Sequence, residues 1–92
     1  MNTETACLGM VESTSIAKGI EAADAMLKAA GVLPVQIKTI CPGKFIVAVR
    51  GDVAAVEASV EAGKGVLGPA LVDGFVIPNV HPEVFTALCG GG

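Results

Sequence analysis

The run Cys41-Pro42-Gly43-Lys44 lies between two apolar, β-rich segments. Its thiol and ammonium groups make it the segment of the chain with the clearest potential for chemistry. Proline sets φ at the second position of a turn and glycine permits positive φ at the third, so Pro42-Gly43 predicts a type II turn. We therefore expect a hairpin with Cys41 and Lys44 at the corners of its tip. A nearby ammonium group favours the thiolate, the form of cysteine that reacts and binds metals. The alternative is a tolerated cysteine in an ordinary hairpin.

The remaining groups with catalytic potential have simpler interpretations. Cys7 lies in a predicted strand and is expected to be packed, whereas Cys89 lies in the glycine-rich C-terminal end and is expected to be incidental. His81 stands before a proline that can begin a helix, so capping is a better interpretation than catalysis. The sequence has no glycine-rich phosphate loop, no GxSxG motif and no histidine cluster. We therefore expect a protein that is not an enzyme.

The composition indicates a single domain with more apolar material than its own core needs. Of the 92 residues, 52% are hydrophobic and only 16% are charged. Domains this small bury a limited share of their surface, and monomers rarely leave large apolar patches in water. The surplus predicts that copies of the chain cover part of one another.

Charge and patterning exclude several partners. The net charge is −3, six basic residues are scattered along the chain, and Trp and Tyr are absent, which argues against nucleic-acid binding. No apolar run approaches the roughly 20 residues of a transmembrane helix. The N-terminus lacks a secretory signal, and three cysteines without CxxC spacing form no readable disulfide or zinc pattern, so a cytoplasmic location is expected.

The periodicity predicts an α/β (α+β) domain in the order β-α-β-β-α-β-α, with a four-stranded, mostly antiparallel sheet and helices on one face. Such a ferredoxin-like order also fits regulatory small-molecule binders. The expected strands are residues 6–12, 33–40, 45–49 and 71–77, and the expected helices begin after residues 15, 52 and 81.

Both faces of the expected strand 6–12 are small or apolar, and the strand 45–49 is continuously apolar, as expected of a central strand covered on both sides. Two further elements are each expected to have one buried face. The strand 33–40 alternates, with Val35, Ile37 and Thr39 expected on a buried face. The face of the first helix expected against the core comprises Ile16, Ile20, Ala23, Leu27 and Ala30.

Several runs together carry a family resemblance. They are Leu8-Gly9-Met10-Val11-Glu12, the helix end at residues 22–30, Val49-Arg50-Gly51-Asp52-Val53, and Val76-Ile77-Pro78 followed by His81. With these residues the chain resembles a bacterial microcompartment shell protein domain from about residue 6 to residue 88. The resemblance implies one domain over residues 1–92, with a glycine-rich tail at 90–92. It also implies cyclic homo-oligomers, hexamers or trimers when two domains are fused, which tile with other shell proteins around encapsulated enzymes.

The resemblance also implies a role for the hairpin. In this family the tip between the middle strands lines a pore, which here would be formed by Cys41, Pro42, Gly43 and Lys44. The run from residue 38 to residue 45 is similar to the first domain of tandem propanediol-utilisation shell proteins that hold an iron–sulfur cluster at the pore. Cys41 is then implied as the metal ligand of a [4Fe–4S] cluster shared between subunits, since thiolates suit such clusters.

The chain departs from the family pattern at two points. It has one domain where the cluster-binding relatives have two, so it is either a stand-alone domain or the first half of a tandem protein. At the tile edge, Asn79-Val80 stands where many members carry an arginine, although Lys28 and His81 occupy their usual edge positions. The resulting hypothesis is a microcompartment shell subunit whose pore binds a cluster for electron transfer or cluster delivery. The alternatives are a shell protein with a plain metabolite pore and a regulatory metabolite-binding domain.

Overall fold

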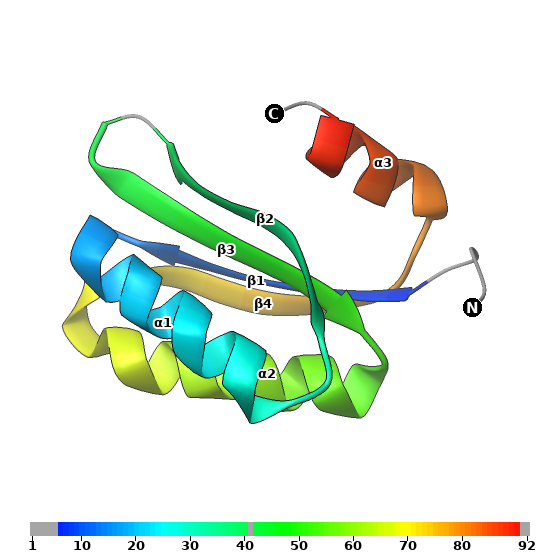
Figure 1. Cartoon of the computed structure of the whole chain (residues 1–92), viewed down its shortest axis with the longest axis horizontal. Coiled ribbons are helices and arrows are strands. Elements are labelled where there is room, and N and C mark those ends of the chain that lie inside the picture. Colours follow the sequence, from blue (N-terminus) through cyan, green and yellow to red (C-terminus); the bar gives the residue numbers. More distant parts are fainter. Residues whose placement is uncertain (1–5, 41, 91–92) are drawn as a thin grey trace.

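The computed structural model describes residues 6–40 and 42–90. The predicted element order β-α-β-β-α-β-α is confirmed, with one added turn of 3₁₀ helix before the last strand (Figure 1). The strands are β1 (Ala6–Ser13), β2 (Leu33–Ile40), β3 (Lys44–Gly51) and β4 (Leu71–Val80), and the helices are α1 (Ile16–Ala29), α2 (Val53–Leu67), η1 (Gly68–Ala70) and α3 (Pro82–Gly90).

The four strands form one sheet in the order β2-β3-β1-β4, and every neighbouring pair is antiparallel. Hence β1 and β3 are central, while β2 and β4 are the two edges. Each edge strand contains a proline, Pro34 in β2 and Pro78 in β4. β4 continues to Val80, three residues beyond the predicted end at 77, and Val80 still pairs with Ala6 of β1.

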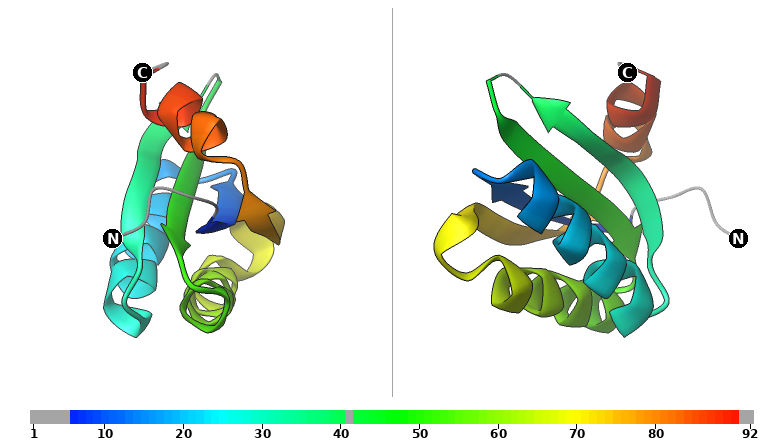
Figure 2. Two further views of the ribbon diagram at one scale, coloured as in Figure 1. Left: turned by 90° about the vertical axis from the view of Figure 1, so that its right-hand side faces the viewer. Right: turned by 60° about the vertical axis from the view of Figure 1, so that its left-hand side comes forward.

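The helices lie on both faces of the sheet. Figure 1 shows α1 and α2 side by side over one face, and the turned views show α3 across the sheet from them (Figure 2). The expectation of helices on one face is therefore wrong for α3. The reason is visible in β1: Cys7 and Val11 pack toward α1 and α2, whereas Leu8 packs with Phe85 of α3. Both faces of β1 are apolar, as predicted, and each has its own hydrophobic cluster.

The buried face of α1 differs from the predicted one. Ile16, Ile20 and Leu27 are exposed, with Ile20 at 56%. The core side instead carries Gly19, Ala22, Ala23 and Met26. Small residues are needed there because a Cβ added to Gly19 would lie 2.4 Å from Cδ2 of Phe45 on β3. Close approach to the sheet, rather than the size of the apolar side chains, decides which face is buried.

The predicted buried face of β2 is also wrong. Ile37 and Thr39 are exposed, and only Val35 is partly covered, through the cluster that includes α3. An edge strand has a neighbouring strand on one side only, so its side chains are covered less than those of the central strand β3. The expectation that β3 is covered on both faces is confirmed, since Val47 and Val49 pack under the helices while Ala48 packs on the α3 side.

Side-chain caps fix the starts of the helices. The Ser15 hydroxyl accepts from the Lys18 backbone N–H at 3.1 Å, and the Asp52 carboxylate accepts from the Ala55 N–H at 2.9 Å. Ser59 of α2 donates to the carbonyl of Met26 at 2.9 Å, near the end of α1 where helix carbonyls lack partners. These bonds fix the starts of α1 and α2 and join the two helices to each other.

Candidate functional site: the hairpin and the edges of the sheet

The β2–β3 hairpin projects at one end of the sheet (Figure 1). Pro42 and Gly43 at its tip are exposed, and Gly43 has φ of +78°, the value that a type II turn requires at its third position. A Cβ at Gly43 would meet nothing within 4 Å, so the glycine serves backbone geometry rather than packing. Cys41, the predicted metal ligand, lies outside the described residues.

Lys44, the predicted pore residue after the turn, is not a free cation. Its Nζ lies 3.8 Å from Oε2 of Glu12 on β1, and both side chains are partly exposed. The pair joins β3 to its neighbour next to the hairpin tip. An exposed pair of this kind stabilises by about 1 kcal/mol or less, but it lowers the local positive charge that the sequence alone assigns to Lys44.

The two described cysteines are placed differently. Cys7 is 2% exposed in the core between β1 and α2, as predicted. Burial raises the pKa of its thiol, with smaller contributions from the carboxylates of Glu57 and Asp52. Cys89 belongs to α3 rather than to a tail, which corrects the expectation. Its thiol donates to the carbonyl of Val35 at 3.5 Å, so it helps to hold α3 against β2.

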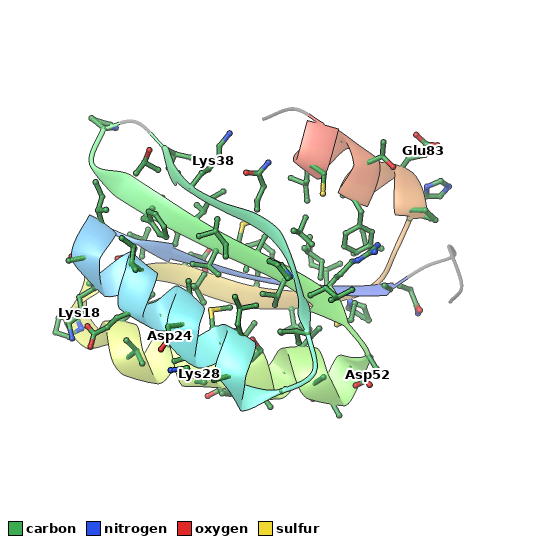
Figure 3. The ribbon with its side chains drawn as sticks, in the orientation of Figure 1. Lys18, Asp24, Lys28, Lys38, Asp52 and Glu83 are labelled. Atoms are coloured by element: carbon green, nitrogen blue, oxygen red, sulfur yellow. The ribbon has the colours of Figure 1, made fainter. Side chains whose placement is uncertain are left out.

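The predicted tile-edge residues come from three elements. Lys28 pairs with Asp24 one helical turn away at 2.9 Å, with both side chains well exposed on α1 (Figure 3). Asn79 has φ of +56°, a left-handed conformation that asparagine tolerates better than most residues. His81 accepts from the Glu83 N–H through Nδ1 at 3.0 Å, which confirms its capping role. Lys28 lies on α1 and His81 lies between β4 and α3, and their part in tiling remains a prediction.

Beyond the hairpin, the described surface exposes many large apolar side chains. Leu33 of β2 is 57% exposed and Ile77 of β4 is 45% exposed, so both edges of the sheet are apolar. The others are Ile16, Ile20, Leu27, Ile37, Val53, Val72, Phe75 and Val84. Sequence reasoning foresaw a surplus of apolar residues but not that it gathers on α1 and on the two edge strands.

The described residues contain no group of three or more His, Cys, Asp or Glu side chains placed to hold a metal ion. None of the helices in that part of the chain is long and apolar enough to cross a membrane.

Comparison with known proteins gives consistent matches. Residues 7–80 match the model of the BMC domain. The chain is 51% identical to the bacterial microcompartment shell protein PduT of Citrobacter freundii over 90% of its length, and it is 42% identical to the major carboxysome shell protein CsoS1 of Prochlorococcus marinus over 99%.

The solved structures agree. A microcompartment protein from Desulfitobacterium hafniense superposes with a TM-score of 0.91 at 55% identity, over 94% of this chain. The chain spans 45% of PduT and 48% of the Desulfitobacterium chain, against 93% of CsoS1. The matched region thus occurs both as about half of longer proteins and as nearly all of a short one.

Proposed function

Because this chain belongs to the BMC domain family of bacterial microcompartment shell proteins, we propose that it forms a ring whose central pore is lined by the β2–β3 hairpin. Proteins of this family are structural rather than catalytic, and their place is the microcompartment shell. The family membership does not support the regulatory-domain alternative.

The exposed apolar edges support self-association. Leu33 on β2 and Ile77 on β4 lie on opposite edges of the sheet, so two unlike apolar surfaces face away from each other. Unlike surfaces on opposite sides of a subunit suit head-to-tail contacts, which close into rings. The ring is a hexamer for a single domain, or a trimer where two domains share one chain. Contacts with other shell proteins and with enclosed enzymes are part of the same proposal.

The finer part of the proposal is that the pore holds a [4Fe–4S] cluster through Cys41. One chain offers too few donors, because Cys7 is buried with a raised pKa and Cys89 lies on α3. Cys41 directly precedes the exposed tip residues Pro42 and Gly43, so a ring with these tips at its axis would bring one thiol per chain together. The donor set fits a cluster in a ring and not in a single chain.

When bound, such a cluster supplies one-electron transfer, and its ligands are thiolates. In this chain Cys41 would hold the iron, and the Pro42-Gly43 turn would fix where the thiol lies. The pair formed by Lys44 and Glu12 would leave the surroundings close to neutral. Electron transfer across the shell and cluster delivery to enzymes inside are the two roles consistent with this position.

Anaerobic reconstitution with iron and sulfide tests the proposal. We expect the wild type to bind iron, to absorb in the visible range and to give an electron paramagnetic resonance signal after reduction, and we expect Cys41→Ser to lose all three. Cys89→Ser is the matched control and should keep them. Equal iron in the wild type and Cys41→Ser would refute the cluster and leave the ring intact, whereas a colourless wild-type ring would favour the plain metabolite pore.

A further inference from the structure

One row of residues crosses the whole sheet near its hairpin end and carries opposite charges at its two ends. Lys38 of β2 pairs in register with Ile46 of β3, which pairs with Glu12 of β1, which pairs with Asp73 of β4. Residues directly opposite each other in antiparallel strands point to the same face. All four side chains therefore lie on the face of the sheet that α3 partly covers.

This row is positive at one edge and negative at the other. Lys38 and Lys44 belong to the β2–β3 half, and Glu12 and Asp73 belong to the β1–β4 half. Lys44 lies outside the row, two residues before Ile46 on β3, and forms an ion pair with Glu12 within the chain.

The outer charges of the row have no such partner. Lys38 and Asp73 are both exposed, and neither takes part in an ion pair among the described residues. Asp73 Oδ1 accepts only the neighbouring Gly74 N–H, at 2.9 Å. Figure 3 shows Lys38 on β2 close to the hairpin, pointing away from the sheet.

Symmetry decides which charges meet when copies associate. A two-fold dimer through one edge would bring together two β2 edges, each with Lys38, or two β4 edges, each with Asp73, so Lys38 and Asp73 would not meet. A cyclic ring instead places the β2 edge of one copy beside the β4 edge of the next. With the hairpin tip toward the axis, the strands run outward, so residues in one row across the sheet lie at similar distances from the axis.

We propose that Lys38 of one copy forms an ion pair with Asp73 of the next copy at every boundary of the ring. This inference rests on the proposed ring. It names the contact that places the β2 edge of one copy beside the β4 edge of the next. Two exposed apolar residues of β4, Phe75 and Ile77, lie on the same face of the sheet as Asp73. Their burial at the boundary would remove water from the pair and strengthen it.

Charge reversal tests the pair directly. We expect Lys38→Glu and Asp73→Lys each to raise the concentration at which half of the chains are in rings by at least about tenfold, since like charges would then face each other. The double variant Lys38→Glu/Asp73→Lys should return close to the wild-type value. Lys18→Glu is the matched control, because it makes the same charge change on α1, where Lys18 pairs with Glu21 at 3.1 Å, and it should leave ring formation unchanged. Native mass spectrometry and sedimentation measure the rings, and circular dichroism checks that each variant is folded.

Mixing provides a second measurement that needs no double variant. Chains with Lys38→Glu and chains with Asp73→Lys can each pair only with the other kind, so an equimolar mixture should form rings of alternating composition. Single variants that form rings as well as the wild type would overturn the pair and leave the ring standing. Failure of both the double variant and the mixture to restore assembly would likewise overturn the ion pair and leave the ring standing. A wild type that stays monomeric at high concentration would overturn the ring and the pair together.

Discussion

The guanidinium carbon of Arg50 lies over the ring of Phe85, 5.4 Å from its centroid, and so joins the end of β3 to α3. Phe85 is also buried in the smaller hydrophobic cluster, with Leu8, Ala48 and Val80. The side chain of Gln36 donates to the carbonyl of Leu88, near the bond from Cys89 to β2. α3 is thus held by a small cluster and a few directional contacts.

The first prediction concerns this docking. We expect Phe85→Ala to release α3 while the rest of the fold persists, because the side chain anchors the smaller cluster only. Backbone hydrogen exchange should become much faster in residues 82–90 than in β1 or β3. Arg50→Lys keeps the charge but alters the contact with the ring, and it should cost about 0.5–1 kcal/mol. Uniformly faster exchange in every element would contradict the separate docking of α3.

The second prediction compares two glycines of α2. A Cβ at Gly63 would lie 2.6 Å from the sulfur of Met26, which is fully buried, whereas a Cβ at Gly65 would meet nothing within 4 Å. Gly65→Ala should raise the free energy of unfolding by up to about 1 kcal/mol through helix propensity. Gly63→Ala should lower it by about 1–3 kcal/mol, because overpacking outweighs the same gain. Denaturant unfolding measures both, and equal stabilisation would refute the close contact.

The third prediction tests the bond between the two long helices. Ser59→Ala removes the hydroxyl that serves the buried Met26 carbonyl, and should cost about 1–3 kcal/mol of unfolding free energy. Thr86→Ala removes an exposed hydroxyl that lies 3.4 Å from the Pro82 carbonyl, and should change stability by less than about 0.5 kcal/mol. Similar losses of unfolding free energy in the two variants would show that burial does not increase the contribution of the Ser59 hydrogen bond to stability.

The fourth prediction follows from the raised pKa of Cys7. The folded chain holds the thiol proton more tightly than the unfolded chain, whose pKa is close to the ordinary value of 9.0. The contribution of Cys7 to stability is therefore fully present below that pH and declines as the pH rises above it. Cys7→Ala should show a flatter decline in unfolding free energy between about pH 8 and pH 10. In the folded wild type, Cys89 should react with iodoacetamide well before Cys7.

Much of this fold can be predicted from the sequence because the residues that begin and end its elements act on their immediate neighbours in the chain. Proline and glycine mark the hairpin. The cap of α1 is Ser15, one of three candidates at residues 13–15, and the cap of α2 is Asp52, as expected. Alternation on β1 likewise predicts two covered faces. The wrong assignments share one cause: periodicity shows that α1 and β2 have apolar faces, but not which neighbours reach them. α1 buries Gly19 and Ala22 instead of Ile16 and Ile20, because the sheet lies too close for larger side chains.

The site is less accessible to sequence reasoning than the fold. Cys41, Pro42, Gly43 and Lys44 are adjacent in the chain, so a motif predicts them. The ion pair between Lys44 and Glu12 joins residues far apart in sequence and depends on the register of β1 against β3. The row that ends in Lys38 and Asp73 needs the pairing of all four strands. Such relationships become visible only once the sheet order is known.

The prolines of the two edge strands have a consequence for how copies of the chain can meet. Pro34 and Pro78 each lack the N–H that a neighbouring strand would need, so another chain cannot extend the sheet by an unbroken ladder of backbone bonds. Copies must therefore meet mainly through side chains. Side-chain contacts select a partner by shape and charge, whereas backbone edges accept almost any extended chain, including an unfolded one. Proline at both edges thus opposes fibrous aggregation of the unassembled chain by strand addition.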